Sequence, residues 1–320
     1  KKNEGGLGIT NFPLVAPLCF AASVAEAFGE TNVDSQAVAT ALLYRTLVAG
    51  LAPEQARIAA EASVKGTAAW MTAPARWDEE VFAAALRYRL GAVGRHDPPH
   101  LQCAPCGLIE PPAAFDRHAV GCVKRRGPNT TKTHNAVRDV SADIAEEAGL
   151  FVTKEPRDFK SFVCFGCSAR LPVEEGPAHL QRCSPGSGFR KSGPDVRISW
   201  DEPAAKMSDG TLAHDVVYDW TVVYASAASH KDASLTTLFA AKRREKEGMY
   251  QGMVEETGSA FVVLGVSSLG VFAPETAAFV RSLARALGRP RAEIESRIRC
   301  ALARGIGRTL RAARARRNQQ

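Results

Sequence analysis

Apolar residues recur every three or four positions through most of the first hundred residues of the chain. Because side chains three and four apart share one face of a helix, this spacing predicts α-helices at residues 15–28, 37–51 and 81–90. Charged residues are scarce between residues 11 and 51, and alanine, valine and leucine dominate there. The stretch contains no set of residues with catalytic spacing. We therefore expect residues 1–98 to form a helical packing module.

From about residue 134 the pattern alternates between helical and strand periodicity. The expected helices are residues 134–148, 234–256 and 274–287, and the expected strands are residues 150–153, 195–200, 215–224 and 261–266. The second and third of these strands flank a polar turn, so we expect them to pair as a hairpin. The order of elements predicts an α+β fold, in which an α/β sandwich is built on a mixed sheet of about four strands.

Two identically spaced sets of cysteine and histidine interrupt this pattern. Each has the form Cys-x2-Cys-x11-His-x3-Cys, and together they use six of the eight cysteines. Zn²⁺ binds four such ligands in a tetrahedron, and a His and a Cys four apart project from one turn of a following helix. The alternative is a group of buried free cysteines with unrelated histidines. The ligands predicted for two structural zinc ions are Cys103, Cys106, His118 and Cys122 in the first set, and Cys164, Cys167, His179 and Cys183 in the second.

Composition limits the class of protein. The 320 residues leave room for two or three domains, and no apolar stretch is long enough to cross a bilayer. The opening Lys1-Lys2 leads into no signal-peptide core, and we expect no membrane partner. Cysteines gathered in metal-binding patterns, with Cys19 and Cys300 in apolar helical contexts, indicate a reducing compartment. The chain does not begin with methionine, and we expect it to be a piece of a longer protein.

The charge is concentrated at one end of the chain. A net charge of +7 suggests a polyanionic partner, and twelve arginines but two glutamates follow residue 280. Ile294, Ile298 and Leu302 recur at helical spacing, which predicts an amphipathic helix with an arginine-rich outer face, continuing into a basic tail. These arginines either grip phosphates or are merely solvated. The candidates for phosphate contact in this region are Arg304, Arg308, Arg311 and Arg314.

Two carboxylates on the predicted hairpin are the main candidates for chemistry. Asp195 opens one strand, and Asp219 lies among valines in the next, where an uncompensated charge is costly to bury. If the strands are neighbours, both carboxylates can bind one Mg²⁺ that activates water and offsets charge on a scissile phosphate. Lys246 offers a cation, with Tyr250 one turn on and Arg243 one turn back on the same helix face. The alternative is that Asp195 caps a turn, Asp219 forms a structural salt bridge, and Lys246 is solvated.

The order Pro194-Asp195, Asp219 and Lys246-x3-Tyr250 resembles the nuclease core of the PD-(D/E)XK superfamily. More narrowly, it resembles the restriction-like endonuclease at the C-terminal end of site-specific non-LTR retrotransposon proteins, in which the lysine lies on the helix after the second strand. Three shorter segments are also similar to these proteins: Gly-Gly-Leu-Gly-Ile at 5–9, Arg-Tyr-Arg-Leu-Gly at 87–91, and His-Asn-Ala-Val-Arg-Asp at 134–139, which is similar to the first helix of the nuclease.

Two features depart from the family pattern. A second zinc module lies inside the nuclease core, and the strand at 262–268 lacks the acidic residue expected near its end. A polar hinge is expected at 125–133 and a flexible linker at 186–193. The expected parts are a helical thumb-like and linker-like module at 1–98, a first zinc module at 99–127, a nuclease domain at 128–290 with the second zinc module at 160–186, and a basic C-terminal helix and tail at 291–320.

The resemblance implies a metal-dependent endonuclease that nicks target DNA for target-primed reverse transcription, with the polymerase upstream in the same polypeptide. Asp195 and Asp219 would hold Mg²⁺ or Mn²⁺, Lys246 would activate water, and Tyr250 would support that lysine. The arginines implied to hold DNA phosphates are Arg138, Arg243 and the C-terminal candidates. The implied partners are target DNA, element RNA and the upstream reverse transcriptase domain, and the implied location is the nucleus. The rival functions are a catalytically silent nucleic-acid-binding module and a zinc-containing protein that binds other proteins.

Overall fold

A computed structural model describes residues 61, 77–90, 98–122, 128–159, 161–164, 167, 170–172, 175–183, 189–224 and 233–315. The predicted helices at 15–28 and 37–51, the segment 5–9, Cys19 and residues 316–320 lie outside the described residues. The helices are α5 (Glu79–Leu90), α6 (Pro112–Gly121), α7 (Pro128–Glu147), α8 (Gly176–Cys183), α9 (Leu235–Glu255), α10 (Pro274–Leu287) and α11 (Arg291–Ala315), with a short 3-10 helix, η2 (Arg157–Phe159). The strands are β1 (Leu101–Gln102), β2 (Ile109–Glu110), β3 (Phe151–Lys154), β4 (Ser161–Cys164), β5 (Arg170–Pro172), β6 (Phe189–Ser192), β7 (Val196–Ser199), β8 (Ala205–Lys206), β9 (Leu212–Ala213), β10 (Asp215–Val223) and β11 (Ala260–Ser267).

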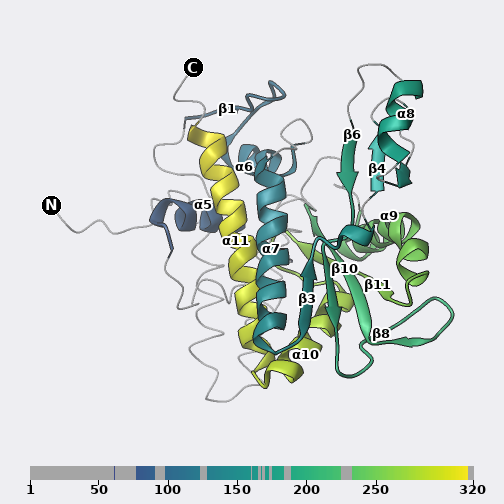
Figure 1. The fold of residues 1–320 in the computed structure, drawn as a ribbon. Helices are drawn as coiled ribbons and strands as arrows, with labels where there is room; N and C mark the ends of the chain where they lie inside the picture. The colour runs from purple at the N-terminus through teal and green to yellow at the C-terminus, as the bar shows by residue number, and fades with distance from the viewer. Residues whose placement is uncertain are drawn as a thin grey trace, which may run out of the picture.

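A four-stranded mixed sheet in the order β11-β10-β7-β3 forms the centre of the molecule (Figure 1). β10 pairs antiparallel with β7 and parallel with β11, and β7 pairs antiparallel with β3. The predicted hairpin is therefore present, and the α+β class with a mixed sheet of four strands is confirmed. β10 is buried along most of its length, which explains its run of valines, because a strand covered on both faces has no polar face.

Helices cover both faces of this sheet. On one face, Tyr250 and Val254 of α9 pack in a cluster with Val217 of β10. On the other face, α7, α10 and α11 form the larger core, in which the ring of Phe279 lies 6.2 Å from that of Trp220. Successive residues of β10 thus point to two different layers of helices, and the position of a side chain along the strand decides which layer it meets.

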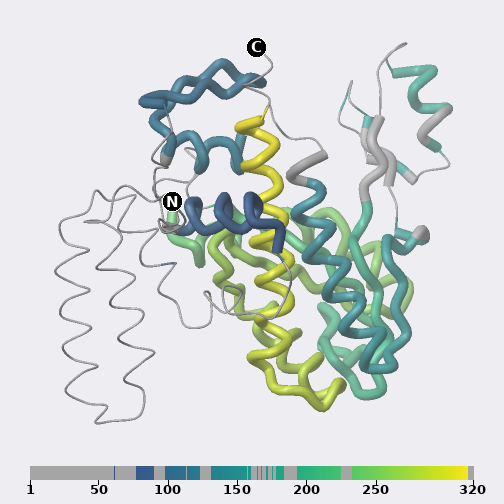
Figure 2. The backbone as a smooth tube through the Cα atoms, turned by 90° about the vertical axis from the view of Figure 1, so that its left-hand side faces the viewer, coloured from purple at the N-terminus to yellow at the C-terminus, as the bar shows by residue number. Residues whose placement is uncertain are grey.

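α11 lies between α5 and α7 and packs against both (Figures 1 and 2). Ile294, Ile298 and Leu302 are buried, as their helical spacing predicts, so this helix is a component of the core. The approach to α5 is close, since a side chain at Gly307 would overlap the carbonyl oxygen of Val81. The basic C-terminal helix that the sequence predicts therefore has one face committed to packing.

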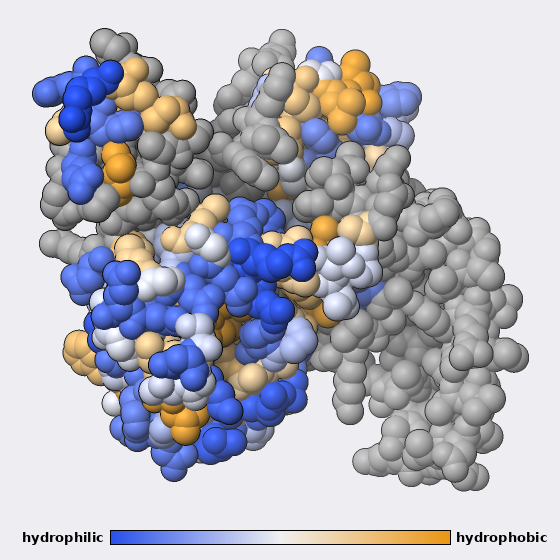
Figure 3. All heavy atoms as spheres, turned by 90° about the vertical axis from the view of Figure 1, so that its right-hand side faces the viewer, coloured by the Kyte–Doolittle hydropathy of each residue, from blue (hydrophilic) through white to orange (hydrophobic). Residues whose placement is uncertain are grey.

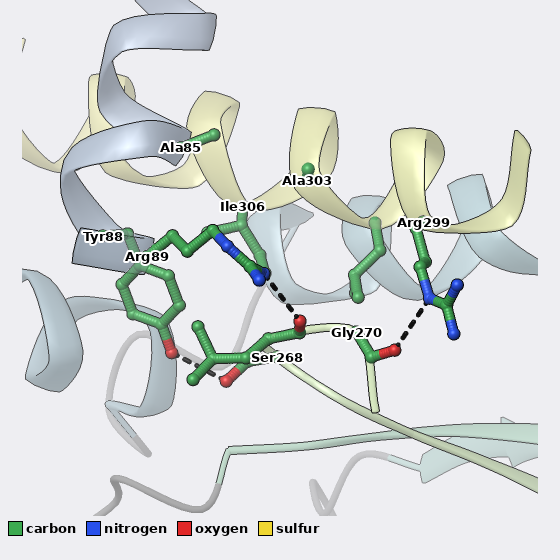
Figure 4. A pocket seen from close by; sticks show the side chains of 10 residues that line it. Ala85, Tyr88, Arg89, Ser268, Gly270, Arg299, Ala303 and Ile306 are labelled. Carbon is green, nitrogen blue, oxygen red and sulfur yellow. Dashed lines mark hydrogen bonds between the residues drawn. The ribbon is translucent and has the colours of Figure 1, made fainter. Parts of the chain in front are cut away.

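The turn after β11 is held by two buried arginines from different helices (Figure 4). Arg89 of α5 donates a hydrogen bond from Nη1 to the carbonyl oxygen of Leu269 at 3.2 Å. Arg299 of α11 donates from Nε to the carbonyl oxygen of Gly270 at 3.0 Å and also pairs with Glu295. Because buried carbonyl groups need partners, these contacts tie both helices to the end of the sheet.

The segment between β3 and β7 forms a small unit of its own. Its three-stranded sheet has the order β5-β4-β6, and α8 packs against β4. The unit stands away from the central sheet, at the same end of the molecule as β1 and α6 (Figures 1 and 2). The second Cys/His set is therefore inserted between two paired strands of the main sheet.

Two predicted connections are wrong in part. The expected hinge at 125–133 is helical from Pro128 onward, because proline suits the first turn of a helix and Thr133 is fully buried. The expected linker at 186–193 contains β6, which begins at Phe189 and pairs with β4. In both places a locally polar sequence forms regular structure, because contacts with distant residues decide the outcome.

The described surface is mostly polar on the face drawn in Figure 3. The large apolar side chains that are exposed among the described residues are Leu108, Ile109, Phe151 and Leu212. None of the helices in the described ranges is both long enough and apolar enough to cross a membrane.

Candidate functional site

The first Cys3His set (Cys103, Cys106, His118 and Cys122) is built by the β1–β2 turn and α6. The backbone N–H of Cys103 donates to the carbonyl of Leu108, and that of Gly107 donates to the carbonyl of Cys103, both at 2.7 Å. Gly107 has a φ of 78°, which suits glycine in this tight turn. His118 lies in the last turn of α6 and Cys122 directly follows it, as the sequence spacing predicts.

The second Cys3His set (Cys164, Cys167, His179 and Cys183) has the same design. Cys164 ends β4, His179 lies on α8, and Cys183 is the last residue of that helix. The Sγ atom of Cys167 lies 3.2 Å from Nε2 of His179. Cys167 is exposed, whereas the first set has two buried cysteines, so the second set is the more open to solvent.

The spacing of the ligand atoms fits a tetrahedral ion. In each set, all four ligand atoms lie within 4.8 Å of one another. The sulfurs of Cys103 and Cys122 are 3.8 Å apart, and two ~2.3 Å Zn–S bonds at the tetrahedral angle would place them about 3.8 Å apart. The distance of 3.1 Å between Cys106 Sγ and His118 Nε2 is shorter than the ~3.6 Å that this geometry gives. Both sets are compatible with zinc, with a small opening of the Cys–His pair on binding.

The predicted acidic residues lie on neighbouring strands. Tyr218 of β10 is paired with Val196 of β7, and continuing this register by one residue places Asp219 opposite Asp195 on one face of the sheet. That face is covered by α9, which brings Lys246 Nζ to 2.8 Å from Oδ2 of Asp219. Both carboxylate side chains are buried. The fold thus places three of the four predicted catalytic residues, Asp195, Asp219 and Lys246, on one buried face of the sheet.

Burial and charge act in opposite directions on Asp219. Burial raises the pKa of this carboxyl above its ordinary value and Asp195 raises it further, whereas Lys246 and His134 lower it. The ammonium of Lys246 lies 2.8 Å from the buried Oδ2 of Asp219 and offsets its negative charge. Carboxylate oxygens are also the ligands that a divalent cation such as Mg²⁺ prefers.

His134, near the start of α7, also belongs to this site, although the sequence assigned it no role. Its Nε2 lies 3.1 Å from Asp195 Oδ2 and 2.9 Å from the carbonyl oxygen of Trp220. Burial by itself lowers the pKa of the His134 imidazole, but the Asp195 carboxylate outweighs it and the pKa rises to about 9. The one available sequence signal was its place in the segment that resembles the first nuclease helix.

Tyr250 and Arg243 lie on α9, one turn to either side of Lys246. Tyr250 is buried, its ring packs against that of Phe261, and Lys246 Nζ is 5.7 Å from its ring centroid. Arg243 Nη1 donates to Oε1 of Glu275 at 2.5 Å. Tyr250 therefore lies beside the lysine as predicted, whereas Arg243 is engaged within the chain.

Other arginines predicted to contact phosphates also have partners. Arg138 is buried and donates to Asp139 at 2.8 Å and to Glu155 at 2.5 Å. Arg314 of α11 donates two hydrogen bonds, at 3.0 and 2.7 Å, to the buried carboxylate of Asp116 on α6. This pair joins α11 to the helix that carries the first Cys3His set.

The remaining C-terminal candidates lie along one side of α11. The guanidinium of Arg304 is 5.0 Å from the ring centroid of Trp77, and Arg311 donates to Asp78 at 3.0 Å. Arg308 is exposed. Among these arginines, Arg308 is the one best placed for a phosphate contact.

The acidic site brings together fewer protein ligands than the Cys3His sets. Among the residues that the structure describes, those two sets are the groups in which three or more His, Cys, Asp or Glu ligand atoms gather within 4.8 Å. A cation between Asp195 and Asp219 would therefore take its remaining ligands from water or a phosphate, as Mg²⁺ sites commonly do.

No protein-family model matches the chain, and no curated protein matches its sequence.

Proposed function

We propose that the acidic site is a metal-dependent, phosphodiester-cleaving centre and that the chain is the DNA-nicking part of a site-specific non-LTR retrotransposon protein. The observation that carries the proposal is the 2.8 Å contact between Lys246 Nζ and Asp219 Oδ2, on the strand that neighbours Asp195. Two carboxylates and a lysine on one buried face are suited to metal-dependent cleavage of a phosphodiester. The arrangement agrees with the resemblance to PD-(D/E)XK nucleases.

Each residue has a distinct role in this proposal. Asp195 and Asp219 hold Mg²⁺ or Mn²⁺, which when bound supplies a Lewis acid and lowers the pKa of water. Lys246 steadies the negative charge that develops on the phosphate and orients the attacking water. Tyr250 packs beside Lys246 and keeps the ammonium at the carboxylates. Burial strengthens these interactions, because charges act more strongly where water is excluded.

The positions of the two Cys3His modules support a nucleic-acid partner. They lie at one end of the molecule, and the second is inserted directly before Asp195 (Figures 1 and 2). In this proposal they hold zinc and present surfaces for target DNA and element RNA. The nicked strand then primes synthesis by a reverse transcriptase domain upstream in the same polypeptide, in the nucleus.

Nicking of supercoiled plasmid DNA in the presence of Mg²⁺ or Mn²⁺ tests the proposal. Asp219→Asn is expected to lower the nicking rate by at least about 100-fold, because an amide cannot replace the carboxylate at the cation. Asp215→Asn is the matched control, since Asp215 is on the same strand but bonds Arg197 and Ser199. Equal nicking by wild type and Asp219→Asn, or no metal-dependent nicking by a folded, zinc-loaded wild type, would reject the proposal.

A second candidate function is a catalytically silent nucleic-acid-binding module. One observation favours it: β11 carries no acidic residue along its length, although the resembled family leads us to expect one near its end. In that case the pair of Asp219 and Lys246 is a structural salt bridge. Salt-sensitive DNA binding without nicking, unchanged in Asp219→Asn, would support this function.

A further inference from the structure

The start of β7 leaves part of β10 without a strand partner on that side. β7 begins at Val196, which is opposite Tyr218, so the backbone of Trp220 extends beyond it. The N–H of Trp220 donates to Asp195 Oδ2 at 2.6 Å, and its carbonyl oxygen lies 2.9 Å from His134 Nε2. A carboxylate and an imidazole thus take the places of the missing strand.

The contacts of His134 fix the place of its proton. Nε2 faces two acceptors, the carbonyl oxygen of Trp220 and Oδ2 of Asp195 at 3.1 Å, so this nitrogen carries a proton and shares it between them. The same Oδ2 accepts the N–H of Trp220, so both donors meet one oxygen of the carboxylate. Oδ1 of Asp195 is therefore the oxygen that remains for a cation.

The two carboxylates of the site need such contacts to stay together. Asp195 raises the pKa of Asp219, because their negative charges repel. Asp219 is held from α9 by Lys246, whose Nζ lies 2.8 Å from Oδ2. Asp195 is held from α7 by His134, which also bonds the backbone of Trp220, the residue after Asp219. His134 thus ties Asp195 to the strand that carries the other carboxylate.

We infer that His134 is a positioning residue, whose Nε2–H fixes the Asp195 carboxylate beside β10 and leaves Oδ1 for the cation shared with Asp219. The inference deepens the proposed function and rests on it, because the cation is the one held for nicking. Carboxylates that bind metal ions are themselves hydrogen-bonded, and loss of such a partner typically weakens metal binding by about 10–100-fold. In this role His134 acts through Asp195 and does not touch the cation.

Calorimetric titration of the zinc-loaded chain with Mn²⁺, without DNA, tests this inference with two uncharged variants. His134→Gln keeps an N–H donor close to the position of Nε2, whereas His134→Leu fills similar space without a donor. His134→Leu is expected to bind Mn²⁺ at least about tenfold more weakly than His134→Gln. In nicking assays the same difference should raise the half-saturating Mn²⁺ concentration and change the rate at saturating Mn²⁺ far less.

Two controls assign the effect to the site. Asp219→Asn should weaken Mn²⁺ binding, which shows that the titration reports the acidic site. His214→Leu is the matched control, because His214 also bonds a backbone carbonyl, that of Trp200 at 3.1 Å, but lies at the opposite end of the β7–β10 pair. That variant should bind Mn²⁺ as the wild type does.

Equal Mn²⁺ affinities of His134→Gln and His134→Leu overturn the inference. If His134→Leu does not fold, the ¹⁵N chemical shifts of the wild-type ring decide, since Nε2 should stay protonated when Mg²⁺ is added and loss of that proton overturns the inference. The two proposals fail separately. Weaker Mn²⁺ binding by His134→Leu in a chain that nicks nothing retains the inference and rejects the nuclease, whereas nicking with equal affinities does the reverse. Mn²⁺ binding that Asp219→Asn leaves unchanged rejects both.

Discussion

Gly305 sets the distance between α11 and α7, directly beside the residue that precedes His134. A Cβ at Gly305 would lie 2.7 Å from Thr133 Cα and 2.9 Å from Thr133 Cβ. Carbon atoms in contact need about 3.5 Å, so Gly305→Ala must separate the two helices by roughly 0.8 Å. Overpacking of this kind costs about 1–3 kcal/mol, and the higher helix propensity of alanine returns up to ~1 kcal/mol. We expect a net loss of about 1–2 kcal/mol in the free energy of unfolding.

Gly248→Ala is the matched control, because Gly248 is an exposed position within α9 where a Cβ would meet nothing within 4 Å. That variant is expected to gain up to ~1 kcal/mol, so the two changes should move the urea midpoint in opposite directions. The assay is urea unfolding followed by circular dichroism, with the m-value compared between variants. If Gly305→Ala stabilises the protein as Gly248→Ala does, α7 and α11 are not in close contact at Gly305.

Three further outcomes are expected. Elemental analysis should find two zinc ions per chain, one for each Cys3His set. Cys103→Ser should lose one zinc ion and lower the main melting temperature, because Cys103 lies in the large core. Cys167→Ser changes an exposed ligand and should leave the main melting temperature nearly unchanged. The pKa of His134 rises from 6.5 to about 9 on folding, so its contribution to stability is complete below pH 6.5 and is lost as pH rises through 9. Denaturant titrations without added Mg²⁺ or Mn²⁺ should show the free energy of unfolding fall over this pH range in wild type and not in His134→Gln. If the exposed Arg308 contacts a phosphate, Arg308→Ala should reduce the slope of log affinity against log salt on duplex DNA by roughly 0.9, and an unchanged slope would remove Arg308 from the DNA surface. Arg314→Ala should instead lower the stability of the protein, because the carboxylate of Asp116 is left buried without its partner.

The elements that sequence predicts best are those with local boundary signals. α10 spans the predicted residues, because Pro274 begins its first turn and Gly288, with a φ of 64°, ends it. β10 is recognisable because its valines and aromatics form a continuous apolar run. β6 was missed, since a four-residue strand depends on pairing with β4, which no local pattern encodes.

The candidate site shows the same division. Asp219 was identifiable because a carboxylate within an apolar strand demands compensation, and Lys246 because helical spacing places it with Tyr250. His134 could not be assigned, since its role depends on where β7 begins and on the path of α7 past that point. The partners of Arg138 and Arg314 were likewise hidden, because they join segments far apart in the chain.

The small unit between β3 and β7 affects how quickly the main sheet can close. The two strands pair although about 40 residues separate them, and closing a loop of that length costs roughly 3.3 kcal/mol of chain entropy. Once β4 and β6 are paired, Ser161 is held opposite Ser192, and the remaining loop of about 10 residues costs roughly 2.0 kcal/mol. Metal captured early by the inserted unit would thus bring the ends of β3 and β7 together and speed their pairing about ninefold. With zinc in the inserted unit, assembly of the edge that holds Asp195 would depend on the supply of that metal during folding.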